Sequence, residues 1–261
     1  MDRDKSGGTV QSLERAIRLL EIIADGDGLP LVHVARQAGL PPSTVHRILA
    51  TLEQRGLVRQ DKDRGDWLIG VRAFQIGSAF LRNRKVSQVA RPFMRELMEA
   101  AHETVSMAVE EAGRAVFLVQ YESHSPVRTF HRPGSSAPMH ASALGKSLMA
   151  AQGDREIRRF LERYGLPTLT AKTIVDPGVF ERELRNVRQR GWAIDDEEHT
   201  LGMRCVGAPI YNEHGDVLAA ISVSGPTARM TDERLMELGP HVKRTARAIS
   251  DALGGVTPTP V

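Results

Sequence analysis

Apolar side chains between residues 30 and 58 recur with the period of a helix in two successive runs. The first run places three small apolar residues on one face: Val34, Ala35 and Ala38. Gly39 follows, where a turn between helices often needs a positive φ, and Pro41 and Pro42 open the second run, where a helix needs no N–H donor. The buried stripe of the second run consists of Val45, Ile48, Leu49 and Leu52. The pattern predicts two short helices joined by a tight turn.

The outward face of the second predicted helix carries polar and small side chains. Arginine can form a forked hydrogen bond with guanine in the major groove of DNA, and free N–H groups at a helix start can bind a phosphate. We therefore expect this helix to read bases. Its predicted contact residues are Ser43, Thr44, His46, Arg47 and Thr51.

A hairpin is predicted directly after this helix. Residues 57–60 and 67–69 have strand character, and a polar turn separates them. The turn carries Lys62 and Arg64, which we expect to contact DNA phosphates. Together with the two helices, the hairpin predicts a winged helix-turn-helix domain at residues 9–71. The alternative is that the same elements belong to a larger core, with Arg47 on a solvated face.

A short apolar stretch predicts a linker helix at residues 72–87. Its apolar side chains include Phe74, Ile76 and Phe80. A helix this apolar needs a cover, and the simplest cover is the same helix of a second subunit. Ordinary packing onto the neighbouring domain is the alternative, and the sequence does not separate the two.

The remainder of the chain, residues 88–254, alternates helices with strands and lacks a dinucleotide-binding or P-loop signature. Strands are predicted at residues 106–109, 115–121, 127–130, 192–194, 202–211 and 217–223. Helices are predicted at residues 89–104, 142–151, 155–164, 179–190 and 232–253. Because hairpins dominate, we expect an α+β fold with a largely antiparallel sheet.

Composition is consistent with a two-domain regulator of 261 residues. The formal net charge is +3, and the excess of Lys and Arg falls in the first third of the chain. A single cysteine excludes an internal disulfide. With neither a long apolar run nor a signal-peptide pattern, we expect a cytoplasmic protein without a membrane partner. Residues 1–8 are expected to be disordered and residues 255–261 to form a flexible tail.

Several stretches of the second domain resemble the IclR family of bacterial transcriptional regulators. They are PMHASALGKSLMA (138–150), GWAIDDEEHTLGMRCVGAPIYNEHGDVLAAISVSGP (191–226) and TDERL (231–235). The stretches VQSLERAIRLLEII and STVHRILATLEQRGL of the first domain resemble it as well, so the likeness runs from about Val10 to Leu253. It implies a winged helix-turn-helix, a linker helix and a GAF-like effector-binding domain. It also implies a homodimer or homotetramer that binds palindromic double-stranded DNA operators, without a cofactor.

The same resemblance implies an effector pocket for a small carboxylate, such as glyoxylate or another 2-oxo acid, in a protein that acts as a repressor. The residues at the matching positions are Ala143, Leu144, Asp195, Met203, Cys205, Ser222 and Ser224. Two hydroxyls two residues apart on a strand share one face, and a helix start near Ser142 can offer N–H groups to a carboxylate. A glyoxylate-responsive member of the family has Gly-Ala where this chain has Ala143-Leu144, which narrows the pocket.

Two other functions remain open at this point. The first is metal sensing by zinc in the second domain. The candidate ligands there are scattered without a tight ligand pair: His124, His131, His140, His199, Cys205 and His214. The second is catalysis by Cys205 with His199 as its base, although the chain has no G-x-S-x-G turn and no evident third group. Each pocket residue also has a structural interpretation: serines bonded to backbone, a buried cysteine, and an aspartate in an acidic run.

Overall fold

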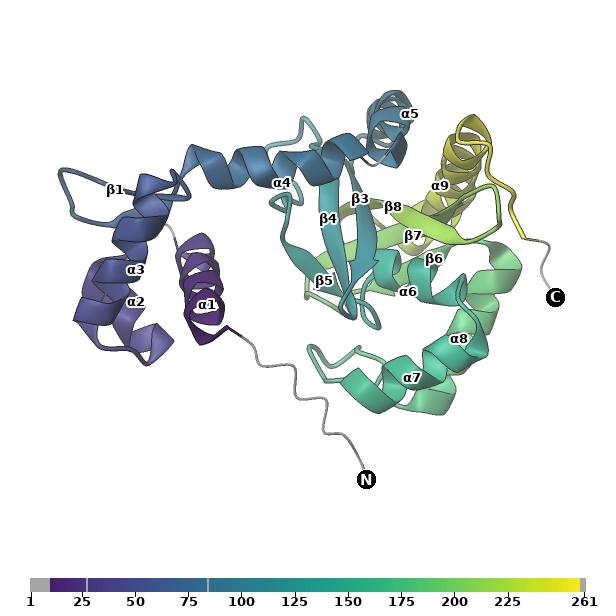
Figure 1. Ribbon diagram of the computed structural model, residues 1–261. Helices are drawn as coiled ribbons and strands as arrows, with labels where there is room; N and C mark the ends of the chain where they lie inside the picture. The colour runs from purple at the N-terminus through teal and green to yellow at the C-terminus, as the bar shows by residue number, and fades with distance from the viewer. Residues whose placement is uncertain (1–9, 27, 84, 259–261) are drawn as a thin grey trace. The chain divides into compact units, whose positions relative to one another are not determined.

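The computed structural model describes residues 10–26, 28–83 and 85–258 (Figure 1), without the side chains of 80–83. The chain divides into two compact units, residues 1–83 and 84–261. The predicted disordered start at residues 1–8 lies outside the described residues, as do the last three residues of the predicted tail. Among the described residues, no helix combines the length and the apolar character that a membrane span needs.

The first unit consists of helices around a small hairpin. Its elements are α1 (Gln11–Asp25), α2 (Leu31–Ala38), α3 (Pro42–Gln54), β1 (Val58–Gln60), β2 (Trp67–Ile69) and α4 (Val71–Asn83). β1 and β2 pair in antiparallel orientation, and a bridge between Leu29 and Trp67 adds a third short segment beside β2. This is a winged helix-turn-helix arrangement.

The core of this unit contains the predicted helical stripes. Its fully buried members include Leu19, Val34, Val45, Leu49 and Trp67. Gly39 ends α2 with φ +67°, and its N–H donates to backbone carbonyls of the last turn of α2, so the turn uses the left-handed conformation that glycine allows.

The second unit is built on a six-stranded antiparallel sheet with the strand order β5-β4-β3-β8-β7-β6. The strands are β3 (Thr104–Glu111), β4 (Arg114–Tyr121), β5 (Ser136–Pro138), β6 (Ala193–Asp196), β7 (Met203–Tyr211) and β8 (Val217–Pro226). β8, the last strand along the chain, therefore lies in the middle of the sheet, between β3 and β7. Its central position means that residues on it have neighbours on both sides.

Helices cover both faces of this sheet (Figure 1). They are α5 (Lys85–Ala101), α6 (Ala143–Ala150), α7 (Asp154–Tyr164), α8 (Pro177–Arg190) and α9 (Asp232–Ala252). α5 and α9 pack together and against the sheet, whereas α6 packs on β6, β7 and β8 with α8 behind it. Leu144 and Leu148 of α6 share a core with Phe117, Ala193 and Ala220, so these strand residues define the face that α6 covers. The predicted α+β fold class is confirmed.

One predicted strand is wrong. Residues 127–130 form an irregular segment, and the strand that pairs with β4 on the side away from β3 is β5, at Ser136–Pro138. Backbone groups of this segment bond to side chains instead of a neighbouring strand: the Thr129 carbonyl accepts from Thr104 Oγ1, and the Val127 carbonyl accepts from Arg229. Alternation of side chains alone did not distinguish this arrangement from a strand.

The helix after the predicted linker begins earlier than expected. α5 starts at Lys85 instead of residue 89, so the predicted boundary between residues 87 and 88 falls inside it. Val86 and Ser87 are buried and belong to the packed face of α5. A polar stretch, residues 82–85, separates the apolar residues of α4 from those of α5, and the predicted boundary lies a few residues after this stretch.

Candidate functional site

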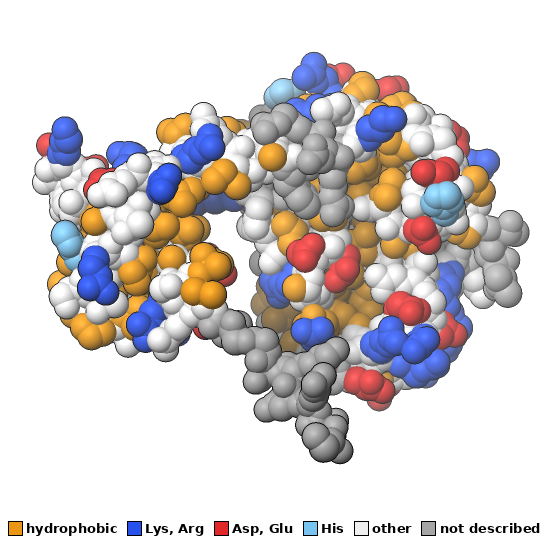
Figure 2. All heavy atoms as spheres, viewed as in Figure 1, with side chains coloured by type: hydrophobic (Ala, Val, Ile, Leu, Met, Phe, Trp, Pro, Cys, Tyr) orange, Lys and Arg blue, Asp and Glu red, His pale blue; other side chains and the backbone are white. Residues whose placement is uncertain are grey.

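The outward face of α3 is free of packing against the rest of its unit. Ser43, His46, Arg47 and Thr51 are exposed, and Thr44 is half-buried. The hydroxyl of Thr51 donates to the Arg47 carbonyl at 3.0 Å, so it is satisfied within the helix. Figure 2 shows Lys and Arg side chains distributed over the displayed face of this unit. The structure thus leaves all five predicted base-contact residues at or near the surface.

The hairpin turn that carries Lys62 and Arg64 has a defined shape. Asp61 Oδ1 accepts the N–H groups of Asp63 at 2.9 Å and Arg64 at 3.1 Å. These bonds, that from Arg64 first, lower the pKa of the Asp61 carboxyl. Lys62 and Arg64 are both exposed, so the turn presents two cations to solvent.

In the second unit, the register of the sheet aligns the predicted effector residues. Cys205 on β7 lies opposite Asp195 on β6 and opposite Ser224 on β8. Gly207 and Ser222 are paired in the next row on the same face, and Ser106 of β3 pairs with Ser222 from the other side. Directly paired residues project from one face of the sheet. Strands β6, β7 and β8 therefore bring the side chains of Asp195, Cys205, Ser222 and Ser224 together, with Ser106 of β3 beside Ser222.

The start of α6 lies over these paired strand residues and closes a cavity above them. A Cβ atom added to Gly207 would lie 2.9 Å from the Ala143 carbonyl oxygen, so the helix start packs on β7 where a side chain is missing. Ser142 caps the helix by accepting the Gly145 N–H at 3.0 Å. The N–H groups of Ala143 and Leu144 have no acceptor among the described residues. These two amides are available for an anion.

The cavity has an empty volume of about 270 Å³, including the part that opens to solvent. All seven predicted effector residues line it. Its further lining residues are Phe117, His131, Ala137, Ser142 and His199. His131 stacks on Phe117 with ring centroids 4.2 Å apart and an interplanar angle of 9°. Burial lowers the pKa of His131 to about 4, with repulsion from His199 adding to the shift, so this ring is neutral at physiological pH.

Asp195 is a buried carboxyl group that lines the cavity. Its Oδ1 accepts the N–H groups of Glu198 at 2.8 Å and His199 at 3.4 Å. Its Oδ2 is buried and has no partner within the described part of the chain. Burial raises the pKa of Asp195 to about 7, against the opposing influence of the Lys146 ammonium.

A buried ion pair lies beside Asp195 and was not predicted from the sequence. Lys146 is 1 % exposed, and its Nζ pairs with Glu198 Oε1. Burial raises the pKa of Glu198 despite this pairing, and Glu198 Oε2 has no partner among the residues described. A sequence signal did exist, because Lys146 is the single charged residue in the apolar segment of α6.

Family models match most of the chain. The model of the IclR helix-turn-helix domain matches residues 12–62, and that of the bacterial transcriptional regulator IclR C-terminal domain matches residues 78–251. The chain belongs to the IclR family. It is accordingly a DNA-binding transcriptional regulator, and the resemblance found in its sequence is confirmed.

Individual relatives support this assignment over nearly full length. The transcriptional repressor IclR of Escherichia coli is 42 % identical over 252 residues, which cover 95 % of this chain and 92 % of that protein. The acetate operon repressor of Salmonella typhimurium is 42 % identical over 251 residues, with the same coverage. A crystal structure of an IclR homologue from Microbacterium hydrocarbonoxydans complexed with 4-hydroxybenzoate has a TM-score of 0.79 and 27 % identity, covering 92 % of this chain and 99 % of that one.

The two alternative functions have little support within this IclR fold. No group of three or more His, Cys, Asp or Glu side chains is placed to hold a metal ion in the described residues. Burial raises the pKa of the Cys205 thiol well above its usual value, and the Asp195 carboxylate adds to the effect. A protonated, buried thiol is a poor nucleophile. The relatives named above are transcriptional repressors by name, which is consistent with a protein that is not an enzyme.

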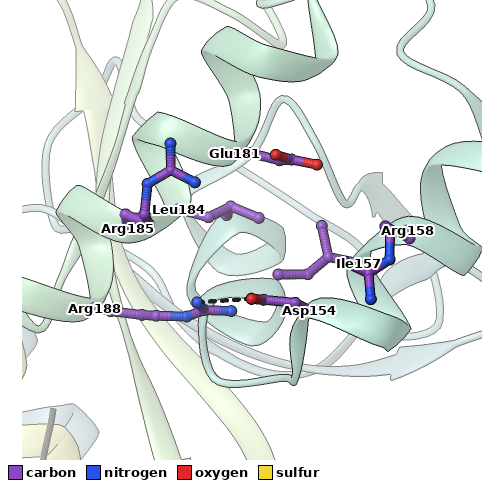
Figure 3. A pocket seen from close by; sticks show the side chains of 7 residues that line it. All are labelled: Asp154, Ile157, Arg158, Glu181, Leu184, Arg185 and Arg188. Atoms are coloured by element: carbon purple, nitrogen blue, oxygen red, sulfur yellow. Dashed lines mark hydrogen bonds and ion pairs between the residues drawn. The ribbon is translucent and has the colours of Figure 1, made fainter. Parts of the chain in front are cut away.

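A second hollow lies between α7 and α8 and differs in kind from the cavity under α6. Figure 3 shows its lining: Asp154, Ile157, Arg158, Glu181, Leu184, Arg185 and Arg188. Arg188 bonds to Asp154 at 3.0 Å and to the Ala150 carbonyl at 2.8 Å, so its donors are already engaged. The hollow is a surface ion-pair region, and we assign it no ligand.

Proposed function

We propose that this IclR-family regulator is a repressor whose operator binding is modulated by a small carboxylate, such as glyoxylate or another 2-oxo acid. In this proposal, the winged helix-turn-helix within residues 9–71 binds DNA, α4 connects it to the second unit, and the second unit, whose first helix is α5, binds the effector.

The observation that supports the proposal is the cavity under α6. It combines the Ser222 and Ser224 hydroxyls with the amides of Ala143 and Leu144, which lack an acceptor in the described part of the chain. Donors converging from a strand and a helix start suit one carboxylate group. Leu144 and the stacked ring of His131 also line the cavity, and their bulk favours a small ligand. The Microbacterium structure with 4-hydroxybenzoate shows that a family member binds a carboxylate, although a larger one.

A DNA-release experiment tests the proposal. An operator is first selected from a random duplex library with the full chain, and its binding is then titrated with and without glyoxylate. We expect glyoxylate to change the midpoint of the titration, because a ligand that prefers one arrangement of the protein shifts the equilibrium toward it. NMR of the mixture should show glyoxylate unchanged after hours. An unchanged midpoint for every small 2-oxo acid tested would contradict the proposed effector class.

Arg47 is expected to supply base recognition. Arg47→Ala should weaken binding to the selected operator by about 1 to 3 kcal/mol, because a forked contact to guanine is lost. Fluorescence anisotropy with the selected operator and a scrambled duplex measures the effect. Equal losses of affinity for both duplexes would show that Arg47 does not recognise bases.

Lys62→Ala and Arg64→Ala are the matched controls for this experiment. Both residues are exposed cations of the same unit, but they lie on the wing. If they contact phosphates, their loss should weaken binding to both duplexes alike and reduce the salt dependence of the affinity.

We also expect a dimer or a larger assembly. Phe74 and Ile76 of α4 are 73 % and 56 % exposed, and Leu13 and Ile17 of α1 are exposed in the same unit. Such apolar surface is unfavourable in water unless a second subunit covers it, and palindromic operators require two reading heads. Light scattering at micromolar concentration checks this expectation, and a monomer both with and without DNA would contradict it.

A further inference from the structure

Asp195 places an acidic group in the cavity where the effector carboxylate is proposed to bind. Its Oδ1 is occupied by the backbone N–H groups of Glu198 and His199. Its Oδ2 is buried without a partner among the described residues, and Asp195 lines the cavity beside Cys205 and Ser224. Oδ2 is therefore the oxygen left to meet a ligand. Two ionised carboxylates in contact where Asp195 is buried would repel each other strongly.

The groups around Asp195 do not compensate a second negative charge. α6 contributes one cation, Lys146, which is already paired with Glu198 from the loop after β6. β7 contributes the Cys205 thiol, which burial keeps protonated by raising its pKa. His199 of the same loop and His131 across the cavity are both uncharged near neutral pH, because burial lowers their pKa values. Before any ligand binds, the Lys146 ammonium thus already interacts with two carboxyl groups, those of Glu198 and Asp195.

We propose that the effector carboxylate binds together with one proton from solvent, which Asp195 carries on Oδ2 and donates to the ligand as a hydrogen bond. The inference rests on the proposed function, since it assumes a carboxylate effector in this cavity. When Asp195 is ionised in the free protein, the proton adds to its Oδ2, no other bond forms or breaks, and the total charge of the cavity is unchanged by binding. A repulsive pair of carboxylates becomes a charge-assisted O–H···O hydrogen bond.

The proposal makes Asp195 a selectivity residue as well. A neutral acid that donates one hydrogen bond fits a ligand with an acceptor oxygen at that position. A ligand amide presents an N–H group or a weaker acceptor there and lacks the negative charge that the α6 amides favour. The cavity should therefore bind glyoxylate and discriminate against its amide.

Proton uptake gives the affinity a defined pH dependence. Burial raises the pKa of Asp195 in the free protein to about 7. Below that value the proton is already present and the affinity should be constant. Above it each binding event must take up a proton, so by linkage the affinity should fall about tenfold per pH unit.

Isothermal titration calorimetry of the full chain with glyoxylate tests this. The titration is run between pH 6 and 9, in phosphate and in Tris, because the two buffers release protons with different enthalpies. We expect about one proton taken up per ligand bound at the alkaline end, little uptake at pH 6, and a Kd that rises about tenfold per pH unit above neutrality.

Variants assign the proton to its site. Asp195→Asn keeps a hydrogen-bond donor without a titrating group, so its Kd should be independent of pH and close to the wild-type value at pH 6. Cys205→Ser and His199→Gln alter neighbouring titratable groups and should keep the wild-type slope. If Asp195→Asn does not fold, the number of protons that the wild type takes up per ligand bound still tests the proposal.

The outcomes separate the inference from the proposed function. Glyoxylate binding without proton uptake and with a constant Kd overturns the inference and leaves the proposed function standing. A slope that disappears in His199→Gln or Cys205→Ser also overturns it, because the proton then belongs to another group. If the wild type binds no glyoxylate between pH 6 and 9, the proposed effector fails, and the inference fails with it.

Discussion

Replacing both Ser222 and Ser224 by alanine is expected to lower glyoxylate affinity by about two to four powers of ten. Both hydroxyls lie on the face of β8 that borders the cavity. Each hydrogen bond to a charged group contributes about 1.5 to 3 kcal/mol, so losing two donors to a buried carboxylate accounts for the predicted loss. Calorimetry with glyoxylate measures the affinity, and DNA titration should show operator binding unchanged without ligand.

Ser106→Ala is the matched control for the double variant. Ser106 is buried on β3, directly beside Ser222, and its hydroxyl has no partner among the described residues. The control therefore removes a buried hydroxyl from the same sheet without touching the cavity lining, and glyoxylate affinity should stay near the wild-type value. A normal response of the Ser222→Ala, Ser224→Ala variant would show that the effector binds elsewhere.

Lys146→Met is expected to destabilise the second unit by about 3 to 5 kcal/mol at pH 8, because the buried Glu198 and Asp195 carboxyls lose their cation. Urea unfolding followed by tryptophan fluorescence measures the change, since Trp192 lies in this unit. The loss should be smaller at pH 5, where both carboxyls, whose pKa values are already raised, can take up protons in the variant.

Adding Glu198→Gln should restore much of the stability that Lys146→Met removes. The double variant replaces a buried ion pair by neutral groups of similar size, a change that is often tolerated when both partners change together. If Lys146→Met alone unfolds at the wild-type urea concentration at pH 8, the ion pair is not a determinant of stability.

The sequence predicted local elements well where buried residues recur at the regular spacing of a helix or a strand. The stripe of Val45, Leu49 and Leu52 defined α3, because helix burial depends on spacing that a single segment contains. Ser222 and Ser224 were assigned to one face of a strand for the same reason. Their role in a pocket came from the family resemblance and remains a proposal.

What the sequence could not predict depends on contacts between distant segments. Lys146 and Glu198 are 52 residues apart, so nothing local indicated that the lysine is buried as an ion pair. His131 enters the cavity because the segment between β4 and β5 is held by side-chain hydrogen bonds, such as Gln120 Oε1 accepting the His131 N–H at 2.8 Å. Such bonds have no periodic signature, and the same segment produced the wrong strand at residues 127–130.

The two walls of the cavity differ in their capacity for evolutionary change. Ser222 and Ser224 sit on the central strand, paired on both sides, and Gly207 must stay without a side chain for α6 to approach. Larger side chains there would disturb the sheet or the helix docking. Leu144 and His131 instead project from a helix start and an irregular segment, where exchanges alter volume without altering strand register. New effector specificities should therefore arise by substitution at Leu144 and His131, while Ser222 and Ser224 keep their hydroxyls.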